Sequence, residues 1–160
     1  MRFQDQVLHH NKKVKSYLVT GKYSEAEDAA CKVVKNIFEA VPTLGIDIDG
    51  TIDENPHFFS VLSNTWPGSV VIITCRNDRS KAIKDLSQWG IYYDSLVLAK
   101  RLSDKPQLIK DNSVDIFIDD QDECLQDIPN SVTVMKIRNG GNFDADSQKW
   151  FYSQYTGEKV

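Results

Sequence analysis

The chain has 160 residues, of which 41% are hydrophobic and 26% charged, a composition typical of one globular domain and unlike that of a disordered chain. Nineteen basic and 23 acidic residues give a net charge of −4, which disfavours nucleic acid or an anionic membrane as the main partner. The three widely spaced cysteines indicate reduced thiols, and no apolar run near residue 1 resembles a secretory signal. We therefore expect a cytoplasmic protein.

Residues 1–41 are expected to form a helical N-terminal extension, a hairpin of two helices. Apolar residues recur at helical spacing on both sides of Gly21, and the second helix begins at Ser24, where Glu27 completes a capping box. Three structural roles stay open for this extension: cover for a sheet face, part of the core, or a contact in a homo-oligomer. A fourth possibility is a lid over the site.

Strands and helices are expected to alternate over residues 44–137. The predicted strands are 44–48, 69–73, 95–99, 114–118 and 132–137, and their continuous apolar runs are typical of parallel strands buried on both faces. A helix is expected over 78–90, ending at Gly90, and a shorter one carries Pro106 in its first turn. A C-terminal helix near 145–155 is expected within residues 138–160. The pattern predicts an α/β fold, a Rossmann-like three-layer sandwich around a mainly parallel five-stranded sheet.

Polar residues follow three of these strands, where ligands bind in parallel sheets. They are Asp47 and Asp49, then Thr74, Cys75 and Arg76, then Asp119 and Asp120. Converging carboxylates repel one another unless a cation lies among them, and hard oxygen ligands favour Mg²⁺ over zinc. Beside Mg²⁺, Asp47 could attack phosphorus while Asp49 moves protons. Thr74 and Lys105 could then hold the phosphoryl oxygens.

The segment Asp47-Ile48-Asp49-Gly50-Thr51-Ile52 resembles the DxDGT first motif of the haloacid dehalogenase superfamily. Thr74, Lys105 and the Asp119-Asp120 pair are similar to its second, third and fourth motifs, in the same order. The resemblance covers about residues 44–125, and the intervals between the motifs are too short for a cap domain. It implies a capless member with Mg²⁺, an aspartyl-phosphate on Asp47 and Asp49 as acid and base. It also implies that Asp119, helped by Asp120, holds the metal with Asp47 and the Asp49 backbone carbonyl.

The resulting expectation is a Mg²⁺-dependent phosphomonoester hydrolase with residues 1–160 as one domain and residues 44–137 as its catalytic α/β core. Its substrate would be a small phosphorylated molecule, such as a nucleotide or sugar phosphate, or an accessible phosphate on a macromolecule. The expected catalytic residues are Asp47, Asp49, Thr74 and Lys105; the phosphate-binding residues are Gly50, Thr51, Cys75 and Arg76; the metal ligands are Asp47, Asp49, Asp119 and Asp120.

Several alternatives stay open. The chain could be a regulatory protein that binds metal and phosphate without useful turnover. Thr74 and Asp120 could be helix-capping residues, and Lys100 or Lys110 could replace Lys105. A cysteine phosphatase is rejected, because Lys81 and not arginine stands six residues after Cys75. A receiver-type phosphorylation switch is disfavoured, because its paired and single acids follow the strands in a different order.

Overall fold

The computed structural model describes residues 24, 26–28, 30 and 41–150. The chain divides into two compact units, Met1–Val41 and Pro42–Val160. Residues 24, 26–28 and 30 of the first unit are helical, and the predicted N-terminal hairpin otherwise lies outside the described residues.

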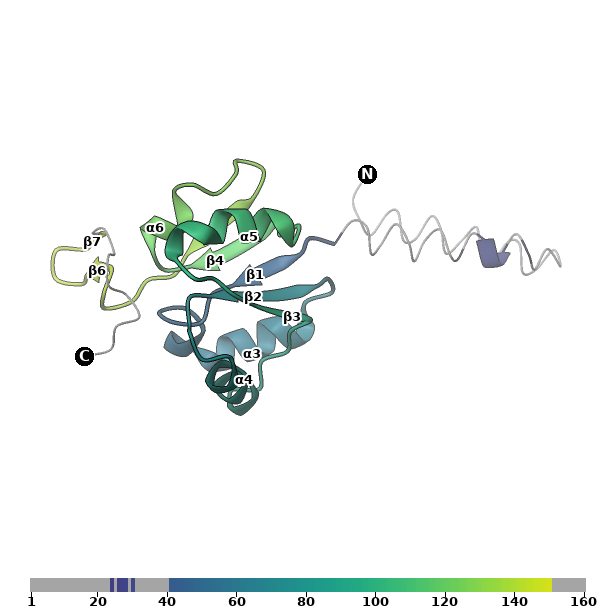
Figure 1. Cartoon of the computed structure of the whole chain (residues 1–160), viewed down its shortest axis with the longest axis horizontal. Coiled ribbons are helices and arrows are strands. Elements are labelled where there is room, and N and C mark those ends of the chain that lie inside the picture. Colours follow the sequence, from purple (N-terminus) through teal and green to yellow (C-terminus); the bar gives the residue numbers. More distant parts are fainter. Residues whose placement is uncertain (1–23, 25, 29, 31–40, 151–160) are drawn as a thin grey trace. The chain divides into compact units, whose positions relative to one another are not determined.

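The second unit is built on a five-stranded parallel sheet (Figure 1). Its strands lie in the order β3-β2-β1-β4-β5, and every neighbouring pair is parallel. They are β1 (Leu44–Ile46), β2 (Val70–Thr74), β3 (Ser95–Leu98), β4 (Ile116–Asp119) and β5 (Thr133–Lys136). The predicted α/β fold with a parallel five-stranded sheet is confirmed, and each strand overlaps its predicted range.

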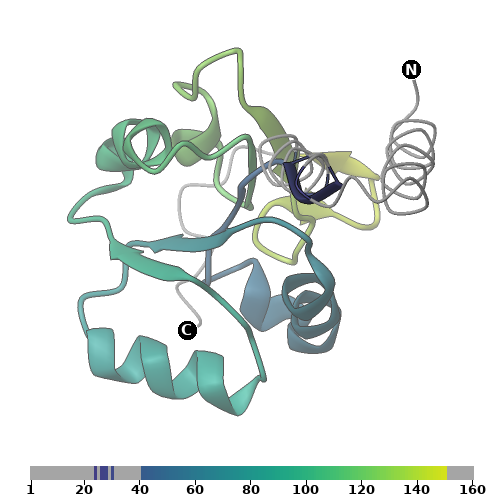
Figure 2. The same cartoon turned by 90° about the vertical axis from the view of Figure 1, so that its right-hand side faces the viewer.

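Helices cover both faces of the sheet (Figures 1 and 2). One face carries α3 (Pro56–Thr65) and α4 (Arg79–Gln88), and the other carries α5 (Lys105–Asp111) and α6 (Asp122–Leu125). Side chains of β2 alternate between the two faces, as strand geometry requires. Ile72 belongs to the core with Phe59 and Leu86, whereas Ile73 belongs to the core with Ile109. These two cores give the three layers that the sequence predicts.

Local signals set the helix bounds. The Asp78 carboxylate accepts a hydrogen bond from the Lys81 N–H at the start of α4. At its end Gly90 has a φ of +69°, and the N–H groups of Gly90 and Ile91 donate to the carbonyls of Ser87 and Leu86. That pairing is a Schellman motif, which glycine favours because its φ is positive.

The predicted C-terminal helix is wrong over residues 145–150, and its remainder lies outside the described residues. The chain forms an antiparallel hairpin there, with β6 (Phe143–Asp144) paired to β7 (Lys149–Trp150). The Asp144 carboxylate accepts hydrogen bonds from the N–H groups of Asp146 and Ser147 and from the Ser147 hydroxyl. These bonds fix a turn in place of a helix.

Two remaining η elements complete the described secondary structure: η1 (Ile52–Glu54), which follows the loop after β1, and η2 (Leu102–Asp104), which leads into α5. No helix in the described ranges is long and apolar enough to cross a membrane.

Candidate metal and phosphate site

Three buried carboxylates meet at the carboxyl ends of two neighbouring strands. Asp47 follows β1 directly, Asp119 ends β4 and Asp120 follows it. Because β1 and β4 are paired in parallel, their carboxyl ends lie at the same edge of the sheet. One carboxylate oxygen of each acid lies within 4.8 Å of the other two. The structure therefore brings together three of the four acids predicted as metal ligands.

Lys105, at the start of α5, lies against two of these acids. Its Nζ is 2.6 Å from Asp119 Oδ2 and 3.0 Å from Asp47 Oδ1, and the residue is only 1% exposed. Lys100 and Lys110 are exposed. Of the three candidate lysines, Lys105 is the one that the fold places in the site.

Burial and neighbouring charge shift the proton equilibria of this cluster. Burial raises the pKa of Asp47 to about 8; Lys105 opposes the rise and the nearby Asp119 adds to it. Burial alone would lower the pKa of Lys105, but the carboxylates of Asp47 and Asp119 hold it well above its ordinary value. When all three acids are ionised, the Lys105 ammonium alone does not balance their charge, and a divalent cation among them would lower their mutual repulsion.

A second layer of contacts positions Asp120. Gly50 has a φ of +77°, and a Cβ at this position would overlap the Asp120 carboxylate. The Asn139 amide donates to Asp120 Oδ2 at 2.9 Å and to the Gly50 carbonyl at 3.1 Å. The fully buried Asn142 donates to the Asp120 carbonyl at 3.0 Å.

Sequence reasoning missed both asparagines. They flank two glycines in the segment Asn139-Gly140-Gly141-Asn142. The available signal was its position, because it follows the fifth strand and so comes to the same edge of the sheet as the acids.

The Asp49 carboxylate is not part of the acidic cluster. The Arg76 guanidinium holds it through Nε, at 2.8 and 2.9 Å from its two oxygens, and through Nη2 at 2.6 Å. Arg76 Nη1 also lies 2.6 Å from Asp85 Oδ2. Asp49 and Arg76, both predicted as site residues, therefore bind each other. The Arg76 guanidinium is paired with two carboxylates, those of Asp49 and Asp85.

The remaining predicted residues lie around the cluster. Thr74 is fully buried at the end of β2, and its hydroxyl accepts the Arg76 N–H at 3.4 Å. Within the described part of the chain, the buried Thr51 hydroxyl has no hydrogen-bond partner. Burial raises the pKa of the half-buried Cys75 thiol, which keeps it protonated and a poor nucleophile.

The two helix-cap alternatives do not describe the structure. Asp78 and not Thr74 caps α4, and the residue at the N-cap of α6 is Gln121 and not Asp120.

No protein-family model and no curated protein matches the chain. A solved structure that does match is a universal stress protein in complex with cAMP. Its TM-score is 0.40 and its sequence identity 10%, and the match covers 61% of this chain and 98% of that one. At this level the likeness assigns neither a family nor a ligand to the present chain.

These comparisons contradict the family prediction. The matching structure is a universal stress protein and not a haloacid dehalogenase enzyme, and no family model supports the motif resemblance. The assignment to the haloacid dehalogenase superfamily is corrected accordingly. The predicted phosphomonoester hydrolase activity, which depended on that assignment, is corrected with it.

Proposed function

We propose that this chain binds Mg²⁺ together with the phosphoryl group of a small phosphorylated molecule. The observation that carries the proposal is the cluster of Asp47, Asp119 and Asp120, whose carboxylates lie within 4.8 Å of one another while fully or almost fully buried. Three carboxylates this close together repel one another when they are ionised, and a divalent cation among them would offset that repulsion beyond what Lys105 supplies. Carboxylate oxygens are also the ligands that Mg²⁺ prefers.

The residues of the site divide into two roles. Asp47, Asp119 and Asp120 would hold the ion, and a predicted contribution from the Asp49 backbone carbonyl stays a prediction. The bound ion would supply positive charge that attracts phosphate oxygens to this edge of the sheet. Lys105 supports the arrangement, because its ammonium orients Asp47 and Asp119 and lowers their mutual repulsion.

Two hydroxyls complete the proposed phosphate site. Thr51 and Thr74 are fully buried, and Thr51 lies next to Gly50 in the loop after β1. A hydroxyl can donate to a phosphate oxygen, so a bound phosphoryl group would give the Thr51 hydroxyl a partner.

The cytoplasmic location predicted from the cysteines stays a prediction.

The proposal is tested by isothermal titration calorimetry of Mg²⁺, followed by inorganic phosphate, into the wild type and two variants. Asp47→Asn removes a proposed ligand, and Asp49→Asn is a matched control two residues away. We expect Asp47→Asn to weaken Mg²⁺ binding at least tenfold and Asp49→Asn to change it less than threefold. Equal Mg²⁺ affinity in the wild type and Asp47→Asn, or phosphate binding that needs no Mg²⁺, would overturn the proposal.

A further inference from the structure

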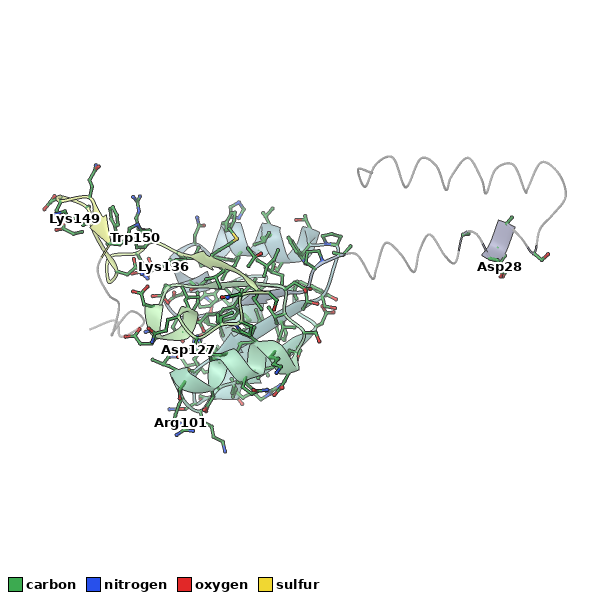
Figure 3. The ribbon with its side chains drawn as sticks, turned by 90° about the horizontal axis from the view of Figure 1, so that it is seen from above. Asp28, Arg101, Asp127, Lys136, Lys149 and Trp150 are labelled. Atoms are coloured by element: carbon green, nitrogen blue, oxygen red, sulfur yellow. The ribbon has the colours of Figure 1, made fainter. Side chains whose placement is uncertain are left out.

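A groove lies next to the acidic cluster and has no role in the site described so far. Its volume is about 530 Å³, which falls in the range of roughly 300–1,000 Å³ common for small-molecule sites. The residues that line it follow β5 in the chain. Figure 3 shows Lys149 and Trp150 of the β6–β7 hairpin near Lys136, the last residue of β5. The lining residues are Arg138, Asn139, Gly140, Phe143, Ala145 and Gln148.

One side chain joins the groove to the acidic cluster. Asn139 lines the groove and also donates hydrogen bonds to Asp120 and to the Gly50 carbonyl. A ligand in the groove would therefore lie one side chain away from the proposed metal ligands.

The groove wall is held in place from beneath. The Asn142 amide is fully buried and donates to the carbonyls of Asp120 and Ile137. The side-chain oxygen of Asn139 accepts a hydrogen bond from the Gly141 N–H at 2.8 Å. These bonds fix the loop before a ligand arrives, which lowers the entropic cost of binding.

The chemistry of the wall suits a flat polar ring. The Arg138 guanidinium lies 4.8 Å from the centre of the Phe143 ring, and the Trp150 ring packs edge-on against Phe143 at 5.3 Å. Guanidinium and aromatic planes both stack on heterocycles. The amide of Gln148 can donate to and accept from the polar edge of such a ring.

We propose that this groove binds the base of a nucleoside monophosphate whose phosphate lies at the metal site. The inference rests on the proposed function, and it narrows the class of ligand from any small phosphorylated molecule to one that carries a heterocyclic base. A bare sugar phosphate would leave the ring-binding wall unused.

Gly140 allows a clean test, because a Cβ added there meets no atom within 4 Å. Gly140→Trp would fill the groove, and Gly140→Ala is the matched control that leaves it open. With Mg²⁺ present, inorganic phosphate, ribose 5-phosphate and adenosine 5′-monophosphate are titrated into the wild type and both variants. We expect the wild type and Gly140→Ala to bind the nucleotide at least tenfold more tightly than ribose 5-phosphate, and Gly140→Trp to lose that preference while keeping its phosphate affinity.

Two results would overturn the inference, and they are distinguishable. If the wild type binds phosphate with Mg²⁺ but shows no preference for the nucleotide, or if Gly140→Trp retains the preference, the groove is not the base site and the proposed function stands. If neither phosphate nor nucleotide binds in the presence of Mg²⁺, the proposed function fails and the inference fails with it.

Discussion

Gly50 is the residue at which backbone conformation and site geometry depend on each other most closely. Its positive φ and its close approach to the Asp120 carboxylate both require the absence of a side chain. We expect Gly50→Ala to displace Asp120 and to weaken Mg²⁺ binding at least tenfold. Calorimetric titration measures this effect, and Gly140→Ala is the control, since it lies in open space. Unchanged Mg²⁺ affinity in Gly50→Ala would remove Asp120 from the proposed ligand set.

In the metal-free protein, the raised pKa of Asp47 makes the free energy of unfolding depend on pH in a predictable direction. Its pKa rises from 3.8 to about 8 on folding, so the folded state binds a proton more tightly than the unfolded state does. The contribution of Asp47 to stability is therefore fully present below the lower value and is lost as the pH rises through the higher one. Asparagine cannot ionise, so Asp47→Asn should become more stable relative to the wild type as the pH rises.

Urea denaturation in the presence of a chelator, at pH 5 and at pH 7.5, measures that difference. The stability of Asp47→Asn minus that of the wild type should be larger at pH 7.5. A difference that is the same at both pH values, or smaller at pH 7.5, would show that Asp47 does not hold its proton in the folded metal-free protein.

At the scale of the element, β1 depends on close packing at the centre of the sheet. A Cβ at Gly45 would lie 2.8 Å from side-chain atoms of both Phe117 and Val114. Overpacking of this kind costs roughly 1–3 kcal/mol, so Gly45→Ala should lower the free energy of unfolding by about that amount. Urea denaturation measures the loss, with Gly140→Ala as a surface control expected to change stability by less than about 0.5 kcal/mol. Equal stability of the two variants would contradict the packing described for β1.

The centre of the sheet was predictable because β1, β2 and β4 contain continuous apolar runs separated by helical segments, a pattern typical of parallel strands covered on both faces. The edge strand β5, in contrast, is mostly exposed. The C-terminal hairpin was not predictable in the same way. Its form depends on hydrogen bonds that the Asp144 carboxylate accepts and on the pairing of Phe143 with Trp150. The helical spacing of apolar residues, from which a helix was predicted here, contains no information about either of these contacts.

At the scale of the whole molecule, the meeting of Asp47 and Asp119 followed from topology, because parallel strands bring their carboxyl ends to one edge. Lys105 did not follow in this way, because it lies at the start of α5 and Lys100 and Lys110 stayed open as alternatives. The pairing of Asp49 with Arg76, 27 residues apart in the chain, did not follow, since charge pairing between loops depends on side-chain directions that the sequence pattern leaves open. Motif order likewise predicted the position of the acids, whereas the family and activity inferred from that order were wrong.

The account depends most on a single divalent ion among Asp47, Asp119 and Asp120. Crystals grown with Mn²⁺ in place of Mg²⁺, measured at the manganese absorption edge, would locate that ion by its anomalous scattering. We expect one strong peak in coordination contact with carboxylate oxygens of all three residues, and its loss in Asp47→Asn crystals. A peak at any other place in the molecule, or an acidic cluster without manganese in wild-type crystals, would contradict the account.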